Sequence, residues 1–298
     1  MIKVANAPCS WGVIENTEGD RKTYLDVINE MSAAGYVGTE LGDWGFMPTD
    51  PKILIPQLEE RSLKMIASWV SVRLYDADYH EVGIEAAVRT AELLAAVGGQ
   101  DCYIIIGDDH STVPVRHDNA GRVTADLMLD DAGWDIYTSG AMRVAKAVKE
   151  ATGLRSLIHH HGATYVETHQ EIEKFLSLTD PDLLGMVFDT GHYMLGQGDP
   201  AEGIRKHGNR IGHVHFKDFK PEKVANADEN GWGYQQLIGQ GVFPELGQGV
   251  VDFTAVYQAL QDINYDGWIV VEQDVLPGMG APFESAKRNR DYLRSIGL

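Results

Sequence analysis

Four short apolar runs in the second half of the chain end in side chains that commonly bind metal ions. They are Leu157-Ile158-His159-His160-His161, Met186-Val187-Phe188-Asp189 with His192 close behind, Ile211-Gly212-His213-Val214-His215, and Trp268-Ile269-Val270-Val271-Glu272. Short apolar runs between helical segments are typical of buried parallel strands. If these strands lie in one sheet, their ends bring histidines and carboxylates together, and we expect a functional site there.

The most specific of these endings is Asp189-Thr190-Gly191-His192. An acid that ends an apolar strand, followed by a glycine turn and a histidine, places a carboxylate and an imidazole on one rim. Asp189 could instead only cap the next helix, with His192 on the surface. Because three other strands end in a similar way, we interpret both residues as part of a site.

Strand alternation indicates which histidines face the interior of a closed sheet. In His213-Val214-His215 both histidines lie on one face. His215, near the strand end, could then bind a metal ion while His213 hydrogen-bonds below it. The alternative is a pair of satisfied core histidines.

The same alternation places His159 and His161 on the inner face and His160 on the outer one. His161 lies nearer the expected strand end, so we expect it to be the metal ligand. His159 would lie beneath it or contact the substrate. Glu167 lies beyond a glycine turn and could face the site or cap the next helix.

The predicted ligand set is therefore His161, Asp189, His215 and Glu272. Glu272 ends an apolar strand, where a carboxylate needs a partner, and a metal ion would supply one. Two imidazoles with two carboxylates suit Mn²⁺, Co²⁺, Fe²⁺ or Zn²⁺ better than Mg²⁺ or Ca²⁺. We expect Mn²⁺ or Co²⁺, with Zn²⁺ or Fe²⁺ as alternatives. The sequence contains neither an HExxH nor a GxSxG motif, so a zinc-protease helix or an esterase nucleophile has no support.

Eight apolar segments alternate with eight amphipathic ones and would position these residues. The expected strands are 2–7, 37–41, 65–72, 102–106, 156–161, 184–189, 211–216 and 268–272, and the expected helices are 22–34, 52–61, 81–97, 134–152, 168–178, 200–207, 253–263 and 282–296. This pattern predicts a (β/α)₈ TIM barrel that forms a single domain over residues 1–298. Two loops, 107–131 and 218–251, are long and leave from strand ends, and we interpret the second as a lid or an oligomer contact.

The composition limits the partners. A formal net charge of −19 makes nucleic acid and anionic membranes poor partners. No stretch approaches the ~20 apolar residues of a membrane span, and no signal-peptide pattern is present. Cys9 and Cys102 are the only cysteines, and we expect buried, reduced thiols in a cytoplasmic protein.

Rim residues from the early strands fit a small, hydroxyl-rich substrate. Ser10, Trp11, Glu40, Asp43, Trp44, Trp69 and Ser71 offer carboxylates, hydroxyls and aromatic faces at or near strand ends. Core packing is an adequate explanation for any single tryptophan. Glu40 is harder to explain as core, because it lies inside an apolar strand, and Lys217 immediately follows another. We expect Trp11, Glu40, His159, His192 and Lys217 to bind a polyol or ketose.

A family resemblance extends over almost the whole chain. The residues that carry it are Pro8-Cys9-Ser10-Trp11-Gly12-Val13, Gly38-Thr39-Glu40-Leu41-Gly42, His159-His160-His161-Gly162-Ala163-Thr164-Tyr165-Val166-Glu167-Thr168, Asp189-Thr190-Gly191-His192, His213-Val214-His215-Phe216-Lys217-Asp218, Glu245-Leu246-Gly247-Gln248-Gly249-Val250-Val251-Asp252-Phe253 and Val271-Glu272-Gln273-Asp274. In these motifs the chain resembles the xylose-isomerase-like TIM barrels, and among them the inosose dehydratases of inositol catabolism.

This resemblance implies loss of water from a keto-inositol, scyllo-inosose, to give a trihydroxycyclohexane dione. The metal ion would stabilise the enediolate that forms when the α-proton leaves, one residue would remove that proton, and another would protonate the departing hydroxyl. Glu272, His192, Glu167 and Lys217 are the candidates, without assigned roles.

The alternative is a metal-dependent ketose isomerase or epimerase that uses the same enediolate. The sugar epimerases of this superfamily place a metal-binding glutamate on strand five, where His161 is expected here, and this difference favours elimination. A DNA-repair nuclease would need more ligands and a basic surface. A non-catalytic sugar-binding barrel would have lost the metal ligands.

Overall fold

The computed structural model describes residues 2–13, 22–109, 112–276 and 279–298. Within them, eight parallel strands close into a barrel in chain order, as the sequence predicts. The strands are β1 (Lys3–Asn6), β2 (Gly38–Glu40), β3 (Lys64–Val72), β4 (Tyr103–Asp108), β5 (Arg155–His159), β6 (Leu184–Asp189), β7 (Ile211–Phe216) and β8 (Trp268–Val271). Pairing of β8 with β1 completes the closure, with Lys3 opposite Trp268 and Asn6 opposite Val271.

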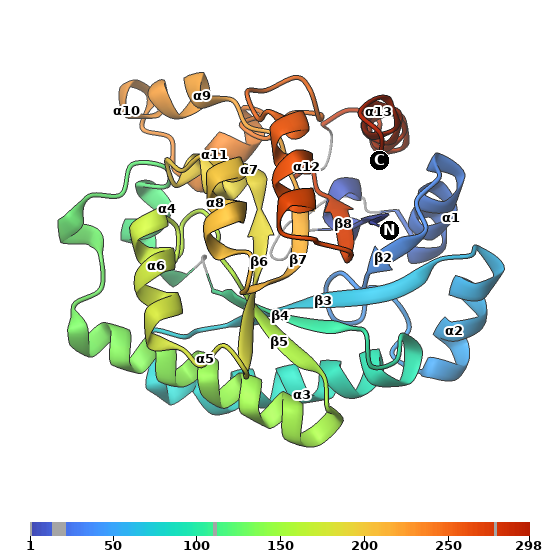
Figure 1. Ribbon diagram of the computed structural model, residues 1–298, viewed down its shortest axis with the longest axis horizontal. Coiled ribbons are helices and arrows are strands. Elements are labelled where there is room, and N and C mark those ends of the chain that lie inside the picture. The colour runs from blue at the N-terminus through green and yellow to red at the C-terminus, as the bar shows by residue number, and fades with distance from the viewer. Residues whose placement is uncertain (1, 14–21, 110–111, 277–278) are drawn as a thin grey trace.

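Helices surround the barrel, and α3 and α5 lie side by side along one side of it (Figure 1). The longer helices are α1 (Tyr24–Ala34), α2 (Pro51–Glu60), α3 (His80–Val97), α5 (Asp131–Thr152), α6 (His169–Leu178), α8 (Pro200–His207), α12 (Phe253–Asp262) and α13 (Pro282–Ser295). These correspond to the eight predicted helices. The sequence did not predict the short ones, η1 (Pro8–Trp11), η2 (Ala77–Tyr79), α4 (Pro114–Asp118), η4 (Ala125–Leu127), α7 (Thr190–Leu195), α9 (Pro221–Ala225), α10 (Ala227–Asn230) and α11 (Tyr234–Gly239).

The inside of the barrel is packed in layers. Buried apolar side chains such as Ile105, Leu157, Val187 and Val270 form a compact cluster there. Nearer the carboxyl ends of the strands the interior becomes polar, and a buried glutamate and several buried histidines replace the apolar side chains. Because the carboxyl ends of barrel strands carry the active site in this fold, we expect the functional site in this polar layer.

The long segment after β7 is held by one buried carboxylate. Asp218 accepts hydrogen bonds from the backbone N–H groups of Gly247 and Gly249, each at 2.8 Å, and of Val251 at 3.1 Å. With the backbone N–H of Phe219 at 2.8 Å, its charge is distributed over four donors that would otherwise need water. The segment contains α9, α10 and α11, and α9 and α10 lie at the upper left of Figure 1.

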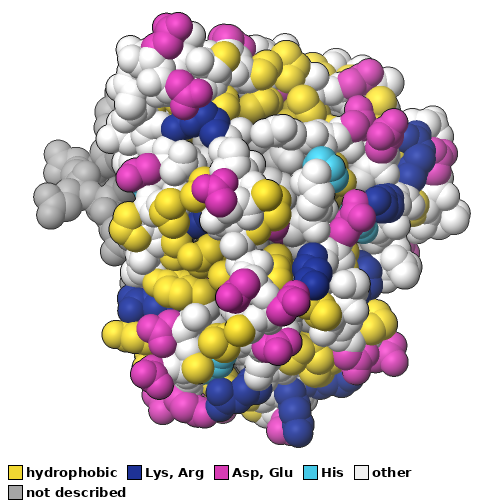
Figure 2. Space-filling model, turned by 90° about the vertical axis from the view of Figure 1, so that its left-hand side faces the viewer, with side chains coloured by type: hydrophobic (Ala, Val, Ile, Leu, Met, Phe, Trp, Pro, Cys, Tyr) yellow, Lys and Arg dark blue, Asp and Glu magenta, His cyan; other side chains and the backbone are white. Residues whose placement is uncertain are grey.

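The surface in Figure 2 carries acidic side chains scattered among hydrophobic and uncharged ones. Lysine and arginine side chains form separate groups on that face and do not make a continuous basic stripe. Among the described helices, none combines the length and apolar character that crossing a membrane requires.

Candidate active site

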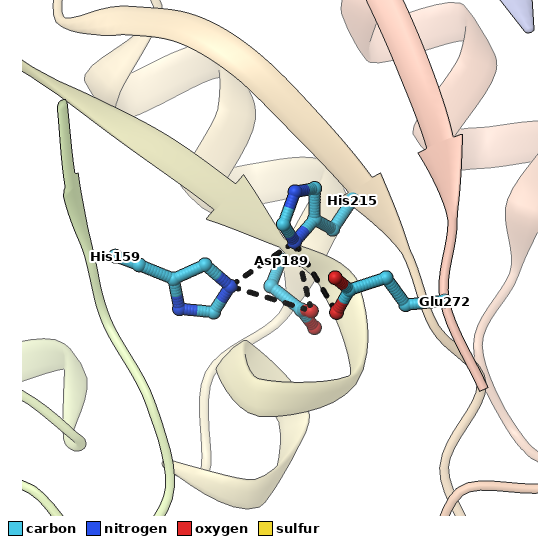
Figure 3. Close-up of side chains that lie close together, drawn as sticks. All are labelled: His159, Asp189, His215 and Glu272. Carbon is cyan, nitrogen blue, oxygen red and sulfur yellow. Dashed lines mark hydrogen bonds and ion pairs between the residues drawn. The ribbon is translucent and has the colours of Figure 1, made fainter. Parts of the chain in front are cut away.

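Side chains from four neighbouring strand ends converge in the polar layer (Figure 3). His159 ends β5, Asp189 ends β6, His215 lies near the end of β7 and Glu272 follows β8. The His215 Nδ1 atom lies 3.1 Å from His159 Nε2, 3.3 Å from Glu272 Oε2 and 3.8 Å from Asp189 Oδ2. One ligand atom from each of the four residues lies within 4.8 Å of the other three.

The histidine that the β5 end contributes to this cluster is His159, whereas the sequence analysis expected His161 there. Strand β5 ends at His159, two residues before the predicted end. The backbone N–H of His161 bonds to Val166 O at 3.0 Å, so the chain has already turned away from the barrel wall. The His161 ring has its Nδ1 2.7 Å from Gly162 O and lies against the His192 ring, with 4.0 Å between centroids. His161 lines the pocket without joining the cluster.

The alternation within the strands is otherwise as predicted. His160 points outward, where its ring packs against Phe188 and Tyr193 and its Nε2 accepts a hydrogen bond from Asp189 N at 3.1 Å. In β7, His215 reaches the cluster and His213 lies one layer deeper.

The cluster fits a divalent metal ion. Asp189 Oδ2 is buried and accepts no hydrogen bond from any described residue. The facing nitrogens of His159 and His215 and the carboxylate of Glu272 surround the same point. A buried carboxylate oxygen left without a donor is costly, and a cation at this point would compensate it. Two imidazoles with two carboxylates form a donor set that suits zinc, manganese, iron or cobalt.

Asp189 both caps the next helix and faces the cluster, and His192 is buried and does not lie on the surface. Its Oδ1 accepts the backbone N–H of His192 at 2.8 Å and caps α7, while Oδ2 faces the cluster. Burial raises its pKa to about 6, against the opposing effect of Lys217. For Glu272 burial also opposes ionisation, but His215 and Lys217 outweigh it and hold the pKa well below its usual value.

Lys217 lies beside the cluster and is nearly fully buried. Its Nζ is 3.1 Å from Glu272 Oε2, 3.1 Å from Asp274 Oδ2, 3.1 Å from His192 Nε2 and 3.7 Å from Asp189 Oδ2. Burial alone would favour neutral lysine, yet Asp274, Glu272 and Asp189 raise its pKa well above the usual value. Lys217 is therefore an ammonium group, and it lines the pocket.

His192 lies behind this ammonium group. Its Nδ1 accepts the backbone N–H of Gly162 at 3.1 Å. Burial, followed by the neighbouring His161 and Lys217, lowers its pKa well below the usual value, so the ring is neutral. The pocket lining does not include His192; its ring lies between the backbone of Gly162 and Lys217.

Two predicted site residues lie elsewhere. Both carboxylate oxygens of Glu167 accept backbone N–H groups, from Gly121 at 2.6 Å and Ala163 at 2.7 Å, so this side chain joins two loops. Trp11 donates its indole N–H to Glu30 in α1 at 2.7 Å and is buried there. Neither residue lines the pocket, because the loop and the η1 turn that carry them direct their side chains away from it.

The pocket also contains residues that the sequence analysis did not place there. Asp274 lies two residues after Glu272, beyond the end of β8 at Val271, and lines the pocket with it. Tyr234, with Gln235 and Ile238 of α11, comes from the long segment after β7 and had no sequence signal. That segment therefore forms a wall of the pocket. Cys9 is half-buried in the lining, and burial with Glu272 and Asp274 raises the pKa of its thiol well above the usual value.

Comparison with known proteins agrees with the fold and the motifs. A family described as "Xylose isomerase-like TIM barrel" matches residues 28–296. The chain is 33% identical over 294 residues to an inosose dehydratase of Lacticaseibacillus casei, covering 98% of this chain and 96% of that protein. It is 31% identical over 299 residues to an inosose dehydratase of Geobacillus thermodenitrificans, covering 98% and 96%.

Solved structures share the fold at low sequence identity. The IOLI protein with a bound zinc atom superposes with a TM-score of 0.75 at 15% identity, over 99% of this chain and 98% of that one. The full-length relatives support a dehydratase, which is a carbon–oxygen lyase. This chain belongs to the inosose dehydratase family, within the xylose isomerase-like TIM barrels.

Proposed function

We propose that this protein is a metal-dependent dehydratase that removes water from scyllo-inosose to give a trihydroxycyclohexane dione. The observation that carries the proposal is the convergence of a metal-type cluster and a buried ammonium group in one pocket. The substrate in this proposal is taken from the relatives, which are named inosose dehydratases. The IOLI protein, which shares this fold, binds a zinc atom, and this supports a metal ion in the present protein.

His159, Asp189, His215 and Glu272 would hold the ion, with Mn²⁺ or Co²⁺ as the expected metals and Zn²⁺ or Fe²⁺ as alternatives. A bound metal ion would act as a Lewis acid that stabilises negative charge on the ketone oxygen. The buried setting strengthens every electrostatic contact with the substrate.

Within this proposal, Glu272 accepts the α-proton and Lys217 protonates the departing β-hydroxyl. Glu272 lines the pocket and is held ionised, so it can receive a proton. Lys217 lines the same pocket as an ammonium group, so it can give one. The carbon–hydrogen and carbon–oxygen bonds break, water leaves, and the resulting enol becomes the dione.

The short distance between these two groups has a stereochemical consequence. Lys217 Nζ and Glu272 Oε2 are 3.1 Å apart, so both would act on the same face of the ring and water would be lost in the syn sense. The proton taken up by Glu272 can then return to the neutral lysine directly. Asp274 would keep the Lys217 side chain in place throughout.

The test is the ultraviolet absorbance of scyllo-inosose mixed with EDTA-treated protein, with and without added Mn²⁺ or Co²⁺. A rise in dione absorbance that requires the metal ion is the expected result. If the metal binds and no absorbance appears, the dehydratase is wrong. A panel of ketoses would then test the alternative, an isomerase or epimerase. An epimerase that uses two carboxylates as acid and base is disfavoured, because the cluster has the His159 imidazole in place of the second carboxylate.

A further inference from the structure

Glu40 links the two histidines of β7 through a single oxygen atom. It ends β2, three strands away from β7 around the closed barrel, and is 4% exposed. Its Oε1 lies 2.9 Å from His213 Nε2 and 3.0 Å from His215 Nε2. The glutamate therefore contacts one residue of the cluster directly and the residue beneath it as well.

This contact determines which nitrogen of His215 carries a hydrogen atom. A carboxylate oxygen only accepts hydrogen bonds, so each Nε2 that faces it must be a donor. A neutral imidazole with hydrogen on Nε2 has its lone pair on Nδ1. The His215 Nδ1 atom is the one that faces Glu272, Asp189 and His159.

The carboxylate of Glu40 is held in place by hydrogen bonds from the same two rings. Both rings place an Nε2 atom within hydrogen-bonding distance of the same carboxylate oxygen. His213 is fully buried, packs against Tyr103 and holds the glutamate from below. The arrangement runs from His213 through Glu40 to His215, and so fixes the angle of the ring that reaches the cluster.

We propose that Glu40 is a positioning residue that orients His215 and directs its Nδ1 lone pair at the metal ion. This role adds to the sequence-based expectation that Glu40 binds the substrate, because Glu40 also lines the pocket. The inference rests on the metal site of the proposed function, because it concerns how that site is kept ready. Ligating histidines generally donate their second N–H to a carboxylate or carbonyl in this way, and loss of that partner typically weakens binding about 10- to 100-fold.

The first experiment measures Co²⁺ affinity by calorimetry for the wild type, Glu40→Ala and Glu40→Gln. We expect Glu40→Ala to bind about 10- to 100-fold more weakly. Glu40→Gln keeps an acceptor oxygen and should recover part of the affinity. The matched control is Asp108→Asn. Asp108 is also a buried carboxylate at a strand end, but it is held by the backbone N–H groups of Leu74 and Tyr165 and by the Tyr137 side chain, so Co²⁺ affinity should stay within about twofold of the wild type.

The second readout reports on the ring itself. In zinc-loaded protein, nitrogen–proton NMR should show a slowly exchanging Nε2–H of His215 in the wild type. Glu40→Ala should lose that protected proton, a change that a merely structural role would not produce. Thermal unfolding establishes that each variant is folded, and Glu40→Gln decides the question if Glu40→Ala is not.

Affinity within about twofold of the wild type in a folded Glu40→Ala protein would overturn the inference. A protected Nε2–H that survives the substitution would overturn it too, as would a wild type that binds no metal ion. If the wild type binds Co²⁺ but makes no dione, the proposed reaction fails. The ratio of Co²⁺ affinities then still decides the role of Glu40.

Discussion

Replacement of Lys217 by methionine is the most informative perturbation of the site. The change keeps the length of the side chain and removes the ammonium group that lies 3.1 Å from both Glu272 and Asp274 and 3.7 Å from Asp189. Removing one partner of a buried ion pair costs about 3–5 kcal/mol, because the remaining charge is left buried. The carboxylates left behind can take up protons, and this limits the loss of unfolding free energy. Protonation costs about 1.4 kcal/mol for each unit by which the pKa of a carboxylate must rise.

The assay is urea unfolding of metal-free protein at neutral pH, paired with dione formation by the loaded enzyme. We expect Lys217→Met to lose about 3 kcal/mol of unfolding free energy, and its turnover to fall by about 10²- to 10⁴-fold, the usual contribution of a general acid. Lys206→Met is the control, because Lys206 pairs with Glu173 on the surface. Its loss should stay within about 1 kcal/mol.

Two outcomes would refute this reasoning about Lys217. A stability loss as small as that of Lys206→Met would mean that the buried carboxylates do not depend on the ammonium group. Near wild-type turnover in Lys217→Met would remove Lys217 as the acid. Full turnover together with full metal content in Glu272→Gln would likewise remove Glu272 as the base.

Three further predictions follow from the geometry. His159→Ala should lose bound metal while His161→Ala retains it, as measured by elemental analysis after dialysis; the reverse would restore His161 as the ligand. Metal affinity should fall as the pH drops below about 6, because a proton on Asp189, whose pKa burial raises to about 6, competes with the ion; calorimetry from pH 5 to 8 that shows no such decline would contradict this. Glu167→Gln should lower the unfolding free energy by about 1–3 kcal/mol, because an amide N–H₂ would face a backbone N–H of Gly121 or Ala163. Metal affinity should stay unchanged. Lost turnover at full stability would instead indicate a chemical role for Glu167.

The barrel could be predicted from sequence because its causes are local. Runs buried on both faces alternate with amphipathic helices, and eight such units have few ways to bury their apolar surfaces other than a closed sheet. Three of the four cluster residues followed for the same reason. Asp189, His215 and Glu272 each end an apolar run, and alternation within a strand is a property of the backbone.

Only the tertiary structure decided the rest, because it depends on where a strand stops and on what crosses the barrel. The hydrogen bond from His161 N to Val166 O ends β5 two residues before the predicted end, and this places His159 in the cluster instead of His161. The bonds from His213 and His215 to Glu40 join residues more than 170 positions apart. Spacing along a chain carries no record of such contacts, because closure of the sheet creates them.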